Sequence, residues 1–266
     1  MSGARSGHLA ATDIRVAFPG ASRGAAPTVA LDGFSLDVAA REIVALIGPN
    51  GCGKSTFLRV AAGLLRPDRG SVAVDDDAIV APDPRIGLVF QEPRLLPWRS
   101  VADNVTWPLE LAGWSAERRE TRLGELLDVV GLEGSADLRP VQLSGGMRQR
   151  AAIARSMALA PEVLLLDEPF SALDELTRER LNGELLALAA ETQMTLLVVT
   201  HSVQEAIFLS DRVIVLSASP GRVVADIRVE LARPRSLATL DAALVGETAA
   251  RIRAHLVDPV AEGAAA

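Results

Sequence analysis

The sequence predicts an α/β fold with a parallel sheet, because short apolar runs alternate with helical patterns along the chain. Three runs are continuously apolar, as expected of strands buried on both faces: EIVALIG (42–48), EVLLLDEP (162–169) and TLLVVTHS (195–202). The second and third of them end in polar residues. RIGLVF (85–90) predicts a further short strand. Helical spacing of apolar residues occurs at 54–65, 115–131 and 176–191.

Two segments depart from this alternation. DIRVAF (13–18) and FSLDV (34–38) each place apolar residues on one face and are separated by the Gly/Ala/Pro loop 19–28, which predicts an N-terminal antiparallel β-subdomain. The mostly helical stretch from about 95 to 160 predicts an inserted α-helical subdomain. The expected organisation is a flexible tail (1–10), one large domain (11–235), and a C-terminal helical extension with a flexible tail (236–266).

Composition narrows the function classes. The net charge of −7 argues against a broad nucleic-acid surface, so we expect no nucleic-acid partner. We find no apolar run near the ~18 residues needed to span a bilayer. The start MSGARSGHLAATD lacks a signal-peptide core and Cys52 is the only cysteine, so we expect an intracellular protein in a reducing compartment.

A glycine loop follows the first buried run and opens a predicted helix. It matches G-x-x-x-x-G-K-[ST], in which curled backbone N–H groups and a helix N-terminus bind phosphate oxygens. Its Ser55 hydroxyl is placed to hold Mg²⁺. For Cys52, a small residue in a tight loop is weighed against an oxidation-sensitive thiol. The expected nucleotide contacts are Gly48, Pro49, Asn50, Gly51, Cys52, Gly53, Lys54, Ser55 and Thr56.

Lys54 is the only lysine among the 27 basic residues of the chain. A lysine is a compact charge on a thin stem, whereas arginine is a broad planar fork. We therefore expect Lys54 to occupy a phosphate cradle that arginine cannot enter.

An acidic pair ends the run VLLLDEP (163–169). Sites in doubly wound sheets form at the carboxyl ends of strands. Beside the glycine loop, Asp167 is expected to hold Mg²⁺ and Glu168 to orient and polarise the attacking water. The alternative is a strand that ends in solvated acids.

The segment LSGGMRQR (143–150) resembles the signature of ATP-binding cassette (ABC) proteins. Gln91 resembles the family's Q-loop glutamine, SALD (171–174) its D-loop with Asp174, and His201 its switch histidine. The resemblance covers about residues 12 to 235. It implies a P-loop NTPase (RecA-like) core that uses ATP and Mg²⁺, with His201 at the γ-phosphate and Gln91 at Mg²⁺ or the attacking water.

The signature also predicts a second phosphate site. Ser144 is expected to cap a helix from about 146 to 159, leaving the N–H groups of Ser144, Gly145 and Gly146 free. In the resembled family this site serves the partner subunit's ATP, which implies a head-to-tail homodimer or a dimer with a paralogue. The family also stacks an aromatic ring on the adenine. Phe18 is the candidate here, and core packing is its alternative.

Three segments resemble ATPases of nitrate, sulfonate and taurine importers: 91–105, 167–178 and 219–235. The resemblance implies a transport ATPase at the cytoplasmic face of the inner membrane, energising an importer through ATP-driven dimer closure. Its partners would be an integral membrane permease and, indirectly, an extracytoplasmic substrate-binding protein. Residues 95–98 (LLPW) would lie near the permease, or alternatively in the core of the helical subdomain. SPGR (219–222) fits the subgroup or a simple hairpin turn.

Other functions remain in competition. The same importer role with a pyrimidine-type vitamin precursor as cargo is one alternative. A soluble ABC ATPase that works on ribosomes or DNA is another, and a P-loop kinase or GTPase is a third. Finally, SVQE (202–205) after His201 predicts a helix that starts with a capping box.

Overall fold

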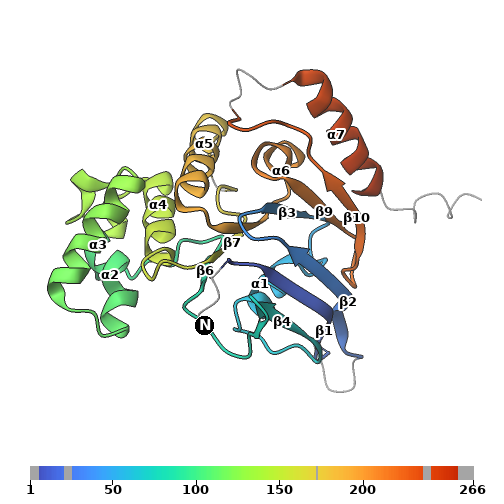
Figure 1. Cartoon of the computed structure of the whole chain (residues 1–266), viewed down its shortest axis with the longest axis horizontal. Helices are drawn as coiled ribbons and strands as arrows, with labels where there is room; N and C mark the ends of the chain where they lie inside the picture. Colours follow the sequence, from blue (N-terminus) through green and yellow to red (C-terminus); the bar gives the residue numbers. More distant parts are fainter. Residues whose placement is uncertain (1–5, 21–25, 172, 236–240, 257–266) are drawn as a thin grey trace, which may run out of the picture.

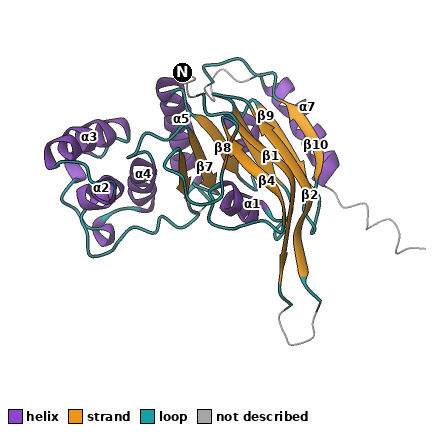
Figure 2. Ribbon diagram, turned by 60° about the horizontal axis from the view of Figure 1, so that its bottom comes forward, coloured by secondary structure: helices purple, strands orange, loops and turns teal. Residues whose placement is uncertain are grey.

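The computed structural model describes residues 6–20, 26–171, 173–235 and 241–256 (Figure 1). Two sheets lie beside one another, and helices α2 (Val101–Leu111), α3 (Ala116–Val129) and α4 (Gly145–Ser156) gather at one side of them (Figure 2). No helix in these described ranges combines the length and hydrophobicity needed to cross a membrane.

The first sheet has four strands in the order β2-β1-β4-β5, with antiparallel pairing throughout. Its strands are β1 (Leu9–Phe18), β2 (Thr28–Val38), β4 (Arg69–Val74) and β5 (Asp77–Ala78). The predicted antiparallel β-subdomain is present, but β1 and β2 are longer than the predicted 13–18 and 34–38. Apolar side chains face the interior at paired positions such as Ile14 and Phe34, and this burial fixes the register.

The predicted C-terminal boundary of the flexible tail, residue 10, is wrong. β1 already begins at Leu9, and the backbone N–H groups of Ser6, Gly7 and His8 donate to the Asp75 carboxylate. These three bonds, with the Ser6 hydroxyl, hold the pKa of Asp75 well below its usual range although partial burial opposes them. The carboxylate at the end of β4 thus anchors residues 6–8.

The second sheet has six strands in the order β10-β9-β3-β8-β7-β6. All neighbours are parallel except β10, which pairs antiparallel with β9. The strands are β3 (Ile43–Ile47), β6 (Ile86–Val89), β7 (Val163–Asp167), β8 (Thr195–Val199), β9 (Arg212–Leu216) and β10 (Val223–Arg228). Every residue of β3 and β8 is buried, which explains their continuous apolar runs. The predicted α/β class is confirmed.

Three helices fill most of the stretch from 95 to 160: α2 (Val101–Leu111), α3 (Ala116–Val129) and α4 (Gly145–Ser156). Each begins after a serine whose side-chain oxygen accepts a backbone N–H bond of the first turn. Short 3₁₀ helices lie at Glu133–Ser135 and Pro140–Gln142. Apolar residues of the three α-helices join one hydrophobic cluster with strands β7 and β8.

The remaining helices are α1 (Lys54–Ala61), α5 (Glu175–Thr192), α6 (Val203–Leu209) and α7 (Ala242–Leu256). α1 ends at Ala61, four residues before the end of the predicted helix 54–65, because the chain turns at Gly63. α7 falls in the predicted C-terminal helical extension. It packs against α6, β9 and β10 through a cluster that includes Ala249 and Ile252.

The predicted capping box at 202–205 is half wrong. Ser202 caps α6 by accepting the Glu205 N–H, but the Glu205 carboxylate does not return to the Ser202 N–H. It is buried and accepts a hydrogen bond from the Thr200 hydroxyl, which in turn accepts the Ser202 N–H. Burial of the carboxylate therefore overrides the local sequence signal.

Arg235 joins the C-terminal part of the domain to the end of α6. The residue is only 8% exposed. Its guanidinium donates to the carbonyls of Leu231, Ile207, Phe208 and Ser210. Burial lowers the pKa of Arg235 to about 10, so the group remains charged at neutral pH.

Replacing Arg235 with glutamine is expected to lower the free energy of unfolding by about 2–4 kcal/mol, since several buried carbonyls lose their donor. Urea unfolding followed by circular dichroism measures this loss. Arg233→Gln is the matched control, because Arg233 forms a partly exposed ion pair with Asp211 and is expected to contribute under about 1 kcal/mol. Equal losses in the two variants would contradict the structural role of Arg235.

Candidate nucleotide-binding site

The predicted site residues gather at the carboxyl edge of the second sheet. β3, β7 and β8 run parallel and end at this edge, where sites form in such folds. Backbone hydrogen bonds hold the loops that follow: the Glu168 N–H donates to Val199 (2.9 Å) and the Thr200 N–H to Leu46 (3.3 Å). Three segments far apart in the sequence thus present their first polar residues side by side.

The glycine loop connects β3 to α1. Gly53, the residue before α1, has a φ of 102°, in the left-handed region that disfavours side chains. A Cβ built on it would lie 2.7 Å from the Ala30 carbonyl oxygen. The second glycine of the motif is therefore required both by its backbone conformation and by the close approach of β2.

Lys54 is 6% exposed, and its ammonium lies inside the glycine loop. Nζ donates to the carbonyl oxygens of Gly48 (2.8 Å) and Pro49 (2.9 Å). Cys52 is fully buried beneath the same loop, with Sγ 3.7 Å from Nζ, which favours the small-residue interpretation over an accessible thiol. The lysine charge is thus held where phosphate oxygens meet such loops.

Ser55 and Asp167 bring two oxygen atoms together, the Ser55 hydroxyl donating to Asp167 Oδ1 at 3.0 Å. Burial raises the pKa of the Asp167 carboxyl, and the Ser55 bond and the charges of Arg59 and Lys54 oppose the rise. A hydroxyl beside a half-buried carboxylate is a hard oxygen pair of the kind that binds Mg²⁺ while the ion keeps several waters. The two residues fit the predicted metal role.

Glu168 is the centre of a second cluster. Gln91 Nε2 donates to Glu168 Oε2 at 3.3 Å and to Ser171 Oγ at 3.4 Å, and His201 Nδ1 lies 3.1 Å from the same carboxylate oxygen. Glu168 has a φ of 44°, an uncommon conformation for a non-glycine residue that is often found at functional sites. The structure therefore brings all three predicted residues into one hydrogen-bonded group.

The signature residues lie elsewhere. Ser144 caps α4 and accepts the Met147 N–H (3.2 Å); Asp174 caps α5 and accepts the Thr177 N–H (3.0 Å). This bond lowers the pKa of Asp174. The two helix starts lie close together, since a Cβ on Gly146 would lie 3.4 Å from Thr177. Among the described residues, no hydrogen bond or ion pair joins Ser144, Gly145 or Gly146 to the glycine loop, and α4 lies apart from α1 (Figure 1).

Phe18 ends β1 and is 38% exposed. This exposure disfavours the alternative of core packing. The side chain is therefore partly accessible, as stacking on an adenine requires.

Sequence reasoning missed one part of the site, the turn between β9 and β10. The SPGR segment forms the predicted hairpin turn, and it also presses on the glycine loop. The Gly221 N–H donates to Ala30 (2.9 Å), and a Cβ on Gly221 would lie 2.0 Å from the Cys52 carbonyl oxygen. The Pro-Gly pair was a signal for the turn, but its contact with residue 52 depends on the tertiary fold.

Replacing Gly221 with alanine is expected to displace the glycine loop and to weaken ATP binding about tenfold or more, because the added carbon has no room beside Cys52. Titration calorimetry with ATP measures the change. Gly124→Ala is the control, since a Cβ there meets nothing within 4 Å. Unchanged affinity in a folded Gly221→Ala protein would contradict this packing.

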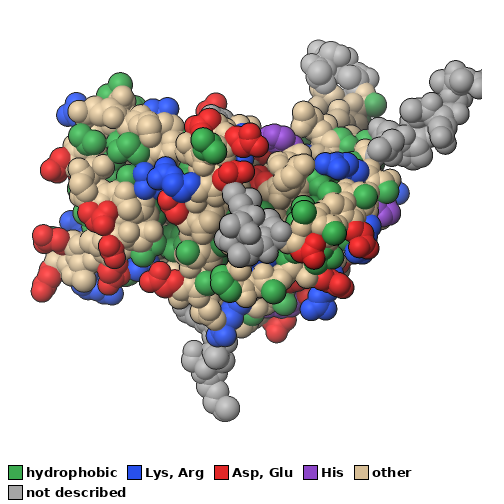
Figure 3. All heavy atoms as spheres, turned by 90° about the horizontal axis from the view of Figure 1, so that it is seen from above, with side chains coloured by type: hydrophobic (Ala, Val, Ile, Leu, Met, Phe, Trp, Pro, Cys, Tyr) green, Lys and Arg blue, Asp and Glu red, His purple; other side chains and the backbone are tan. Residues whose placement is uncertain are grey.

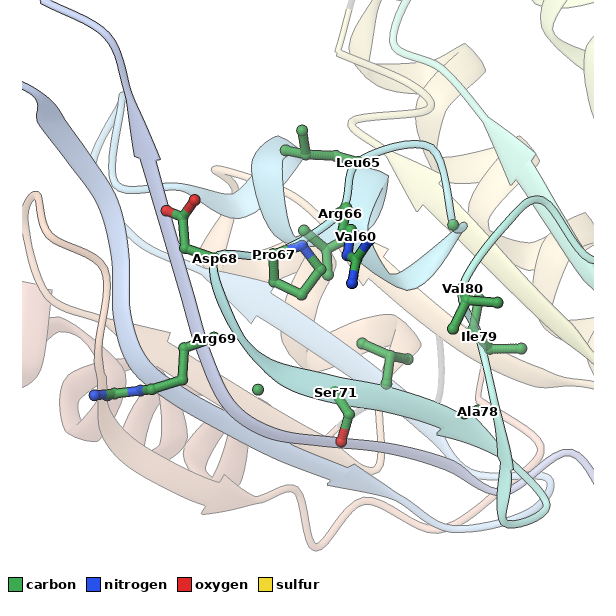
Figure 4. A pocket seen from close by; sticks show the side chains of 13 residues that line it. Val60, Leu65, Arg66, Pro67, Asp68, Arg69, Ser71, Ala78, Ile79 and Val80 are labelled. Carbon is green, nitrogen blue, oxygen red and sulfur yellow. The ribbon is translucent and has the colours of Figure 1, made fainter.

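A separate cavity of about 400 Å³ lies between the end of α1 and β4 (Figure 4). Two of its three charged side chains have partners: Arg69 pairs with Asp13 (2.9 Å), and Asp68 accepts the Ala17 N–H (2.7 Å). None of the predicted site residues lines it. This cavity is therefore separate from the candidate nucleotide site at the sheet edge.

Comparison with known proteins agrees with the geometry. The family model described as ABC transporter matches residues 31–171. An aliphatic sulfonates import ATP-binding protein from Burkholderia cenocepacia is 51% identical over 205 residues, which are 77% of this chain and 74% of the relative. A protein of the same name from Xanthomonas axonopodis pv. citri is 50% identical over 212 residues, 79% of this chain and 84% of the relative.

Solved structures share the fold. The dimeric post-hydrolysis state of an ATP-binding cassette bound to ADP and Pi superposes with a TM-score of 0.73 at 32% identity, covering 84% of this chain and 100% of that one. CbiO1 from Clostridium perfringens, part of an ABC transporter complex, gives a TM-score of 0.73 at 27% identity, with 84% and 88% covered.

Proposed function

Because the chain belongs to the ABC transporter family, we propose that it hydrolyses ATP to energise the import of a small organosulfonate or related oxyanion through a separate membrane permease. The observation that carries the hydrolytic part is the contact of Glu168 with Gln91 and His201 beside the Ser55–Asp167 pair. The cargo class rests on the names of relatives about 50% identical to this chain.

Each residue of the sheet edge has a role in this reaction. Lys54 and the N–H groups of the glycine loop bind the β- and γ-phosphates of ATP. Ser55 and Asp167 would hold Mg²⁺, which neutralises charge on the phosphates. Glu168 accepts a hydrogen bond from the attacking water and polarises it. Gln91 and His201 contact this carboxylate, and with ATP bound His201 would contact the γ-phosphate and Gln91 would reach Mg²⁺ or the attacking water.

A dimer completes the site in this proposal. Ser144, Gly145 and Gly146 of one chain would bind the γ-phosphate held by its partner. Two exposed apolar residues flank these helix starts, Val141 (85% exposed) and Leu176 (78%), as expected of a surface that becomes covered. The similar cassette that was solved as a dimer with ADP and Pi supports this arrangement.

The permease is expected to contact the segment after the Q-loop. Leu95 packs against the helical core, as expected if the segment 95–98 were part of the core of the helical subdomain. Trp98 is 68% exposed, as expected if the segment contacts the permease. Asn104 fixes the segment by accepting the Leu96 N–H (2.7 Å). A cavity of about 530 Å³ lined by Phe90, Leu96 and Trp107 opens beside it and suits an inserted helix. Such docking would place the chain at the cytoplasmic membrane face, with a substrate-binding protein on the other side.

Growth of a strain that lacks this chain tests the cargo. With taurine or an alkanesulfonate as the sole sulfur source, growth is expected to fail, while growth on sulfate remains normal. The wild-type chain is expected to restore growth on the sulfonate, and Glu168→Gln is not. Normal growth of the deletion strain on sulfonates would contradict the cargo assignment and direct the test to nitrate and to vitamin precursors.

A further inference from the structure

A buried pair of side chains encloses the short segment that carries His201. Thr200 and Glu205 are 1% and 7% exposed, whereas His201 itself is exposed. The Thr200 hydroxyl donates to the Glu205 carboxylate and accepts the backbone N–H of Ser202 (3.0 Å). The residues directly before and after His201 are therefore joined to one another through a single hydroxyl group.

Both ends of this segment are attached to regular elements of the fold. Thr200 follows β8, and its backbone N–H donates to the carbonyl of Leu46 in β3 (3.3 Å). Glu205 lies in the first turn of α6, and its backbone N–H donates to the Ser202 side chain (3.2 Å). The bond between the Thr200 and Glu205 side chains thus links the parallel sheet to the start of α6, with His201 between them.

The His201 side chain has little else to fix its direction. It is 54% exposed, and among the described residues its hydrogen-bond contact is with Glu168, from Nδ1 to Oε2 at 3.1 Å. In the proposed reaction His201 acts at the γ-phosphate, so this contact alone does not define its working position. Because a misplacement of about 1 Å can cost about 10²-fold in rate, the backbone that carries the ring has to be held firmly.

The burial of Glu205 is unusual for this chain. It is the only buried acidic residue in the part of the chain that the structure describes. On the face shown in Figure 3, by contrast, acidic side chains are visible at the surface. Burying a carboxylate is unfavourable unless its oxygens are hydrogen-bonded, and Oε1 of Glu205 has no partner among the described residues. The bond of Oε2 with Thr200 is therefore the contact that connects this carboxylate with the site.

We propose that Thr200 and Glu205 are positioning residues, which hold His201 in the direction that ATP hydrolysis requires. Among the described residues, their side chains bond to each other and to Ser202, and not to the glycine loop, Gln91 or Glu168. Their effect on turnover therefore passes through His201. This inference rests on the proposed function, because it presupposes that His201 takes part in hydrolysis.

Removing the Thr200 hydroxyl tests the proposal. In Thr200→Val, kcat for ATP hydrolysis is expected to fall about tenfold or more while KM for ATP changes little, since the glycine loop is untouched. Thr200→Ser restores the hydroxyl and is expected to recover most of the turnover. Steady-state phosphate release measures both constants.

Thr195→Val is the matched control. Thr195 is fully buried at the start of the same strand, and its hydroxyl oxygen accepts the Arg41 N–H (2.8 Å). The variant loses a comparable hydrogen bond at the opposite end of β8 from His201, and we expect normal turnover from the folded protein. An equal loss of turnover in Thr195→Val and Thr200→Val would show a general effect of destabilising the strand and would overturn the proposal.

The dependence on His201 is tested by combining variants. His201→Ala is expected to lower turnover about 10²-fold, and adding Thr200→Val is expected to lower it no further, because the ring to be positioned is gone. Single-turnover hydrolysis with excess protein follows these slow rates. A further tenfold loss in the double variant would overturn the positioning role and leave the proposed function intact. Normal turnover in His201→Ala would instead contradict the role of His201 and the inference with it.

A second pair of variants decides if Thr200→Val does not fold. Glu205→Gln keeps an oxygen that accepts the Thr200 hydroxyl, whereas Glu205→Leu has a similar volume and no acceptor. We expect near-normal kcat from the glutamine variant and a loss of about tenfold or more from the leucine variant. An acid in the first turn also stabilises a helix start, and if this were its whole role both variants would unfold more easily with equal turnover, which would contradict the proposal.

Discussion

Replacing Glu168 with glutamine is expected to slow ATP hydrolysis by about 10²–10⁴-fold while ATP binding remains near the wild-type level. The amide keeps the size of the side chain and can still contact Gln91 and His201, but it is a poor acceptor for the proton of the attacking water. The phosphate contacts of Lys54 and Ser55 are unchanged. Steady-state phosphate release gives the rate, and titration with ATP gives the affinity.

Glu92→Gln is the matched control for this prediction. Glu92 follows Gln91 in the chain and is exposed, so the substitution removes the same charge close to the site without touching the cluster. We expect near-normal turnover from it. Wild-type turnover in Glu168→Gln would contradict the proposed role of Glu168. An equal loss of turnover in both variants would show that the loss comes from removing a negative charge near the site and not from the position of Glu168.

Replacing Lys54 with arginine is expected to reduce hydrolysis by about 10²–10³-fold, nearly as much as Lys54→Ala. The ammonium is almost fully buried and lies within 2.9 Å of two loop carbonyls, so a planar guanidinium has no room in the same position. Keeping the charge therefore does not keep the function. This result would explain why a chain that otherwise uses only arginine has lysine at residue 54.

Arg59→Lys provides the reciprocal control. Arg59 is on the exposed side of α1, where either base supplies charge, and we expect its exchange to change turnover by less than about twofold. Circular dichroism checks that each variant is folded. A Lys54→Arg protein that keeps most of its activity would contradict the argument from side-chain shape.

The parallel sheet was predictable from sequence because burial on both faces leaves a simple pattern. β3, β7 and β8 are short, largely apolar runs, and each leads directly into a motif. The first sheet was harder. β4 (RGSVAV) contains arginine and glycine and was not recognised, since its pairing with β1 is a tertiary contact.

The candidate site shows the same division. The order of motifs predicted which residue types would meet at the sheet edge, and the contacts of Glu168 with Gln91 and His201 agree with it. Gly221 and Cys52 are more than 160 residues apart in the sequence. Their contact therefore depends on how the hairpin turn packs against the glycine loop in the tertiary fold.

The position of the signature residues leads to the most direct test of the account. Within the part of the chain that the structure describes, no hydrogen bond joins Ser144 to the glycine loop of its own chain, so the proposed mechanism requires a second chain to complete each ATP site. Sedimentation equilibrium of Glu168→Gln with Mg-ATP measures this requirement. We predict the mass of two chains with Mg-ATP and of one chain without it, and one chain in both conditions when Ser144→Arg is added. A single-chain mass at a concentration of Mg-ATP that calorimetry shows to be saturating would contradict the central claim.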